Sequence, residues 1–176
     1  MLFRSRRCEV TGRADDAGRK ALDLPLQDKA SGPIDAHVIA VQRPTGTSDI
    51  EVALDLAQAK VRFDEIAWRK PAGKPAKTGF VLKLDRADLT SLESLKANAD
   101  DLDLIGRITF NKDTDVQTLE LTRLKVGSSD VRVGVSRRQQ GGYTVGVAGD
   151  RLDLRPLFAD DDDPQPKKKG PALGEI

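Results

Sequence analysis

The chain has 176 residues, and its 29 Lys and Arg against 28 Asp and Glu leave a net charge of +1. This balance argues against a basic nucleic-acid-binding domain. One cysteine and one histidine exclude an intrachain disulfide and a Cys-based zinc cluster, and they remove most metal and triad chemistry. We therefore expect no enzyme, no metal or cofactor site and no nucleic-acid partner.

The first 20 residues match no pattern that we can place, and we expect a disordered start there. Arg4, Arg6 and Arg7 are not followed by an apolar segment, so this start is not a secretory signal peptide. No apolar run in the chain approaches the roughly 18–20 residues that span a bilayer. Cys8 lies in this start with no catalytic partner in view, and we expect no functional role for it.

Apolar residues alternate with polar ones from about residue 50 onward, which is the pattern of half-buried β-strands. Such runs occur at residues 50–56, 80–84, 102–110, 131–136 and 143–148. The segments between strands hold turn-forming sequences: Pro44-Thr45-Gly46, Pro71-Ala72-Gly73, Asn111-Lys112-Asp113, Gly127-Ser128-Ser129-Asp130 and Gln140-Gly141-Gly142. Short strands joined by short loops predict an all-β antiparallel meander. His37 lies in a further alternating run and is predicted to be a strand residue, not a ligand or a base.

Residues 88–98 fit two patterns. Leu89, Leu92 and Leu95 are spaced by three, as on one side of a helix, whereas Leu95, Ala97 and Ala99 alternate as in a strand. We favour a strand.

Apolar residues at i, i+2, i+5 and i+7 recur along the chain. The sets are Val61-Phe63-Ile66-Trp68, Leu119-Leu121-Leu124-Val126 and Leu54-Leu56-Ala59-Val61, and the segment from Leu152 fits the first three positions. A β-bulge changes which side chains face inward in this way. We interpret the pattern as a repeated strand-with-bulge unit of an elongated array, the alternative being chance in a β-rich chain.

A single sheet with one apolar face needs something to cover that face in water. The sequence offers no convincing amphipathic helix for this, so the sheet must curl, pair with sequence outside the chain, or hold an apolar ligand. The candidate inward-facing residues are Phe80, Leu82, Leu84, Leu102, Leu104, Ile108, Phe110, Leu119, Leu121, Val131, Val133, Val135, Val145 and Val147. They are predicted to contact lipid acyl chains across a face that no protein covers. The alternative is that they form the core of a closed sandwich or barrel.

Several stretches together resemble the AsmA-like envelope proteins of the YhdP group. They are residues 54–59 (LDLAQA), 66–76 (IAWRKPAGKPA), 124–131 (LKVGSSDV), 142–145 (GYTV), 149–157 (GDRLDLRPL) and 31–33 (SGP), and the similarity covers roughly residues 22–158. The resemblance implies an open, twisted, groove-like sheet from the middle-to-late part of a long periplasmic protein. An N-terminal helix outside this chain would anchor that protein in the inner membrane. Its implied role is phospholipid transport to the outer membrane and maintenance of the envelope barrier, without catalytic residues.

We expect three regions: the start at 1–20, the sheet at 21–158, and a charged linker at 159–176 that leads to a further module, as in a fragment of a longer protein. In the linker, the aspartates at 160–163 are read as solvated chain instead of a calcium site. The lysines at 167–169 are read as a spacer instead of a headgroup contact. The alternative function is a β-sandwich scaffold that binds partner proteins through its edge strands.

Two motifs are singled out. Trp68, Lys70, Pro71 and Gly73 could mark the mouth of a lipid-binding unit, but we favour a Trp68 that packs at a sheet edge before a turn at residues 71–73. The second motif, Leu152, Asp153 and Leu154, is read as structural.

Overall fold

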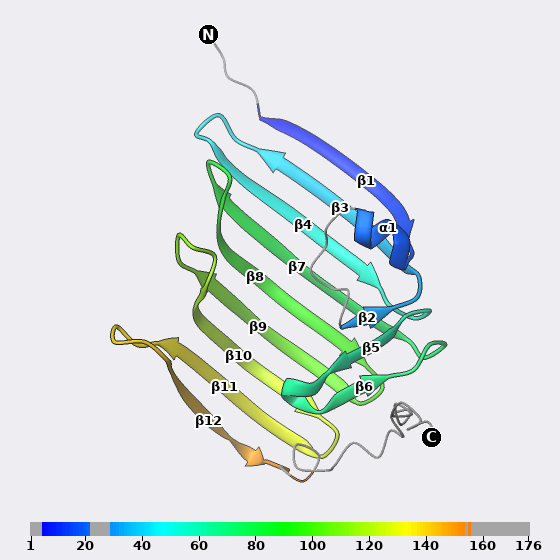
Figure 1. The fold of residues 1–176 in the computed structure, drawn as a ribbon, viewed down its shortest axis with the longest axis vertical. Helices are drawn as coiled ribbons and strands as arrows, with labels where there is room; N and C mark the ends of the chain where they lie inside the picture. Colours follow the sequence, from blue (N-terminus) through cyan, green and yellow to red (C-terminus); the bar gives the residue numbers. More distant parts are fainter. Residues whose placement is uncertain (1–4, 22–28, 154, 156–176) are drawn as a thin grey trace, which may run out of the picture.

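The computed structural model describes residues 5–21, 29–153 and 155, and this part of the chain is all-β. Nine of its strands form one antiparallel sheet in the order β1-β3-β4-β7-β8-β9-β10-β11-β12 (Figure 1). A second, small sheet has the order β2-β5-β6. The elements follow one another as β1 (Arg6–Ala14), α1 (Asp16–Ala21), β2 (Ala30–Ser31), β3 (Ile34–Gln42), β4 (Thr47–Asp55), β5 (Lys60–Phe63), the 3-10 turn η1 (Asp64–Ile66), β6 (Trp68–Lys70), β7 (Ala76–Asp85), β8 (Asp88–Ala99), β9 (Leu102–Phe110), β10 (Val116–Val126), β11 (Ser129–Arg137) and β12 (Tyr143–Arg151).

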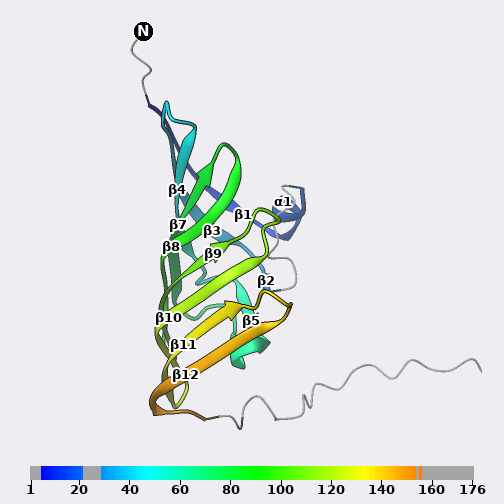
Figure 2. The same ribbon diagram turned by 90° about the vertical axis from the view of Figure 1, so that its left-hand side faces the viewer.

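The large sheet is a meander whose strands follow chain order. Tight turns join most neighbours, whereas the connection from β1 to β3 carries α1 and β2, and the connection from β4 to β7 carries β5, η1 and β6. The sheet stays open, with β1 and β12 at its two edges, and its strands twist along its length (Figure 2). This confirms the predicted all-β antiparallel open sheet. Neither a closed barrel nor a sandwich covering the whole sheet forms in the described residues.

Two β-bulges explain the segment that fits both helix and strand. Residues 88–98 lie in β8, where the pairing register shifts beside Leu84 and again between Leu92 and Leu95. Each bulge adds a residue, so side chains on one face recur after three positions instead of two. Ser94, at the second bulge, has the left-handed φ of 53°. The predicted strand is therefore confirmed, and the leucine spacing comes from bulges.

The apolar spacing i, i+2, i+5 and i+7 corresponds to a bulged strand at residues 119–126. Between Leu121 and Leu124, β10 has the expected register shift. Opposite it, Gly106 has no room for a side chain, because a Cβ there would lie 2.4 Å from the backbone oxygen of Glu120. The same pattern at residues 61–68 is not a bulged strand but the hairpin of β5, η1 and β6, and at residues 54–61 it spans the end of β4, a turn and β5. The interpretation as a repeated unit is thus wrong there.

The expectation of a disordered start is also corrected. Residues 6–14 form β1, and each of them pairs with a residue of β3. The sequence of β1 shows little alternation of apolar and polar residues, because the residues on its apolar side include Cys8 and Gly12. Main-chain pairing holds the strand in place instead, and an exposed ion pair at 2.7 Å joins Arg13 to Asp35 across the two strands. Arg19 of α1 is 2% exposed and donates to the backbone oxygens of Gly32 and Ala30, which ties the helix to β2.

The small sheet packs on the apolar face of the large sheet, over the strand ends where β9 begins and β10 ends (Figures 1 and 2). Val61 and Trp68 from the small sheet form a core with Leu102, Leu124 and Val131 from the large one. The prediction that no protein covers the apolar face is therefore wrong at this end. The cover comes from residues 61–68, which the sequence pattern had assigned to another bulged strand.

Candidate functional site

The large sheet has an apolar face and a largely charged face, because successive side chains of a strand point to opposite sides. In β7, for example, Leu82 pairs with Ile50 and Leu92 on the apolar side, whereas Val81 pairs with Glu51 and Glu93 on the charged side. The strand register carries this division across the whole sheet. It separates a surface suited to water from one suited to hydrocarbon.

The charged face is crossed by ion pairs between neighbouring strands. Arg107 of β9 contacts Glu120 of β10 at 2.9 Å, and Lys125 of β10 contacts Asp130 of β11 at 2.7 Å. Both pairs are exposed, and pairs of this kind contribute little to stability. Their pattern identifies this face as the one turned toward water.

One row of small and apolar side chains runs across all strands of the large sheet on its other face. We call it the open row; its members, each paired with the next, are Cys8, Ala40, Ile50, Leu82, Leu92, Ile108, Leu119, Val135 and Val145. With neighbouring strands about 4.8 Å apart, the row is about 38 Å long. None of its members is buried, and only Leu119 packs against the core. The row is thus a continuous apolar track that is accessible along its length.

A second row crosses the same face at the strand ends where the small sheet packs, and most of its members lie in or against the core, whereas Gly149 at its β12 end is exposed. We call it the covered row; it consists of Ala36, Leu54, Thr78, Ala97, Leu104, Leu124, Val131 and Gly149. Leu124 and Val131 are buried in the core, and Leu54, Ala97 and Leu104 pack against it.

The predicted lipid-contact residues divide between the core and the open surface. Six of them belong to the core or pack against it: Leu102, Leu104, Leu119, Leu121, Val131 and Val133. The other eight lie outside it: Phe80, Leu82, Leu84, Ile108, Phe110, Val135, Val145 and Val147. Sequence reasoning placed Ile50 in a strand and considered Leu92 as helix or strand, but it did not include them in this set. Their positions became clear only through the register.

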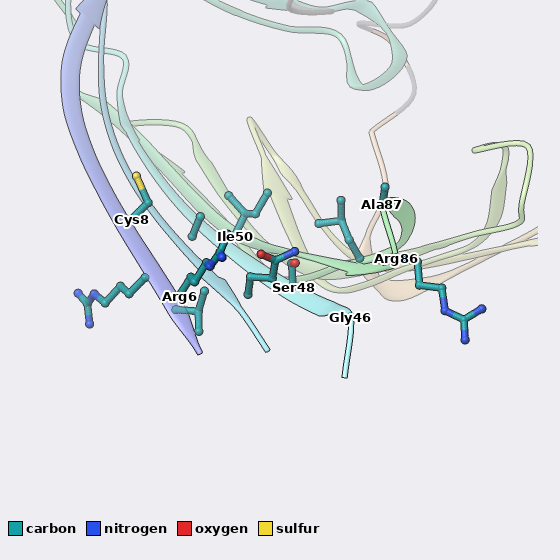
Figure 3. Close-up of a pocket in the computed structure, with 12 residues that line it drawn as sticks. Arg6, Cys8, Gly46, Ser48, Ile50, Arg86 and Ala87 are labelled. Atoms are coloured by element: carbon teal, nitrogen blue, oxygen red, sulfur yellow. The ribbon is translucent and has the colours of Figure 1, made fainter. Parts of the chain in front are cut away.

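A hollow of about 750 Å³ lies at the β1 end of the open row (Figure 3). Cys8, Ala40 and Ile50, the first members of the open row, form part of its lining. Cys8 and Ile50 point to the same side of the sheet (Figure 3), and Arg6 is paired with Gln42, which is paired in turn with Ser48 at the strand ends. The lining includes three arginines and no carboxylate. Of these arginines, Arg7 pairs with Glu9 at 3.1 Å, and the side chain of Arg86 extends away from Cys8 and Ile50 (Figure 3).

Trp68 and Lys70 hold the small sheet together. Trp68, in the edge strand β6, is 3% exposed; its Nε1 donates to Asp101 Oδ1 at 2.8 Å, and its ring stacks on Phe63. Lys70 Nζ donates to the backbone oxygens of Pro71 and Lys74, each at 2.9 Å, and to that of Ala57 at 3.3 Å, and burial lowers its pKa.

The turn after β6 contains Pro71 and Gly73. Gly73 has the positive φ of 85° that favours glycine, and its N–H donates to Ala57 O at 2.8 Å. Trp68, Lys70, Pro71 and Gly73 thus lie at the covered end of the sheet.

Asp153 fixes the chain after β12 to the turn between β10 and β11. Its carboxylate accepts hydrogen bonds from Ser128 and Arg155, and its N–H donates to Ser129 Oγ at 2.9 Å. The contacts to Arg155 and Ser128 hold the pKa of the Asp153 carboxyl well below its usual range. Leu152 is exposed, and Leu154 lies outside the described residues.

His37 lies on the charged face, where its Nε2 is 2.8 Å from Glu9 Oε1 in the neighbouring strand.

Within the described residues, no group of three or more His, Cys, Asp or Glu could hold a metal ion, and no helix is long and apolar enough to span a membrane. The predicted linker at 159–176, with its aspartates at 160–163 and its lysines at 167–169, lies outside the described residues.

No protein-family model, curated protein or solved structure matches the chain. The resemblance to AsmA-like envelope proteins therefore stays a prediction.

Proposed function

We propose that this chain is a segment of a periplasmic protein, anchored in the inner membrane, that carries phospholipid toward the outer membrane and so maintains the envelope barrier. The acyl chains lie along the open row. The observation that supports this most is the continuity of that row: each strand contributes one small or apolar side chain, and none of them is buried. The resemblance to AsmA-like envelope proteins suggests the compartment and the role in the envelope.

The size and chemistry of the row suit hydrocarbon. Its length of about 38 Å exceeds that of one acyl chain, since a whole bilayer core of two leaflets is only about 30 Å thick. Covering apolar surface contributes about 25 cal/mol per Å², and the contact needs no directional chemistry. Arg6 and Arg86, which line the hollow, supply positive charge that suits the phosphate of a headgroup at the β1 end.

Native mass spectrometry of the full chain, purified from a bacterial envelope, tests this function. We expect the wild-type chain to carry phospholipid and Leu82→Gln to lose most of it, because the substitution puts an amide into the middle of the open row. Val81→Gln is the matched control, since Val81 is the adjacent residue on the charged face. A lipid-free wild type, or equal loading of the two variants, would contradict the proposal.

A further inference from the structure

The two edges of the large sheet differ in how they are protected. An edge strand presents unpaired backbone N–H and C=O groups, and proteins guard such edges with charged residues. The edge strand β1 carries Arg6, Arg7, Glu9 and Arg13, and α1 lies next to it. This edge is protected against pairing with another strand.

The opposite edge, β12, has no such protection. Residues 143–149 (YTVGVAG) contain no charge, and every residue of β12 is exposed. Val145 is 61% and Val147 47% exposed, and both are strand-forming residues. Within the described part of the chain β12 pairs with β11 alone, so its outer backbone groups have no strand partner. An uncharged edge strand of this length is a template for a further strand.

The sequence of β12 is complementary to itself in the antiparallel direction. With Gly146 opposite its own copy, Val145 faces Val147 and Thr144 faces Ala148. No like charges meet in the segment 143–149, because it has none. This register also keeps side-chain parity, so the apolar faces of the two sheets lie on the same side.

From this self-complementarity we propose that β12 pairs with β12 of a second copy of this chain around a two-fold axis at Gly146. Val145, the last member of each open row, then contacts Val147 of the other copy, and the apolar faces of the two sheets become continuous. The paired edge gains ladder hydrogen bonds and hides part of the exposed valines. This inference stands apart from lipid binding, because it depends on the edge of the sheet and not on its face.

Charge reversal at the axis tests the proposal. Gly146 has no positive φ, and a Cβ there would meet nothing closer than 4.0 Å, so the fold accepts a side chain. In sedimentation over a concentration series, we expect the wild type to reach twice the mass of the monomer, whereas Gly146→Lys and Gly146→Asp each stay monomeric. Mixing these two variants restores the dimer, because opposite charges then face each other. A wild type that stays monomeric, which would leave the edge to a different protein, overturns the proposal, and so do single variants that dimerise like the wild type.

Disulfide trapping gives a second readout that does not depend on the stability of the charged variants. In a Cys8→Ser background, Gly146→Cys places a thiol opposite its own copy, where neighbouring Cα atoms lie about 4.5–5.5 Å apart and a disulfide can form. We expect oxidised glutathione to link this variant into dimers. Thr144→Cys is the control, because residue 144 faces residue 148 and lies about 14 Å from its own copy. Equal linkage of the two variants would contradict the register.

Discussion

The open row and the covered row consist mostly of aliphatic side chains on the same face of the same sheet, yet they have different surroundings. Leu124 in the covered row is buried in the core, whereas Leu82 in the open row is half-buried and lies outside that core. The difference shows that one face can serve two purposes. One row contributes to the core, and the other stays open to hold the acyl chains under the proposed function.

The largest effect on stability is expected at Trp68, which anchors the cover of the covered row. Trp68→Ala removes the indole from the core, and we expect it to lower the free energy of unfolding by about 3–5 kcal/mol. Urea unfolding followed by circular dichroism measures this. Trp68→Phe is the control, because it keeps a ring against Phe63 and loses the hydrogen bond to Asp101. A change below about 1 kcal/mol for the alanine variant would show that the small sheet does not stabilise the fold.

A matched pair of leucines compares the two rows directly. Leu124→Ala leaves a cavity in the core, and we expect a loss of about 2–5 kcal/mol in the free energy of unfolding. Leu82→Ala removes carbons that are only half-buried, and we expect a loss of about 1 kcal/mol. The same urea experiment measures both. Equal losses would mean that the open row is ordinary core.

The smallest effect concerns pH and Asp153. The pKa of this carboxyl is lower in the folded chain than its unfolded value of about 3.9. Its contribution to stability is therefore present above that value and is lost as the pH falls below it. We expect Asp153→Asn to lower the urea midpoint near neutral pH, with the gap to the wild type narrowing as the pH falls toward about 3. A gap that stays constant with pH would exclude this ionic contribution.

The meander could be predicted because alternation and turn residues are local signals. Residues 131–136 and 143–148 alternate cleanly, and the turns around Gly46 and Gly127 separate strands as expected. The bulge at residues 121–124 was predictable because it leaves a characteristic change of parity.

The small sheet and β1 could not be predicted, for two physical reasons. The hairpin at residues 61–68 has the same apolar spacing as a bulged strand, and only contacts that are distant in sequence, such as Trp68 with Asp101, distinguish the two. The strand β1 depends on backbone pairing with β3, which leaves little hydrophobic signal. Because the small sheet was not predicted, the sequence could not show which of the predicted lipid-contact residues belong to the core and which stay open.

The most direct test of the account is site-specific photocrosslinking to phospholipid vesicles. A photoreactive phenylalanine analogue replaces either Leu82, on the apolar face, or Val81, one residue away on the charged face. The account predicts that residue 82 becomes covalently linked to phospholipid and residue 81 does not. Equal labelling at both positions, or no labelling at residue 82 in a folded chain, would contradict it.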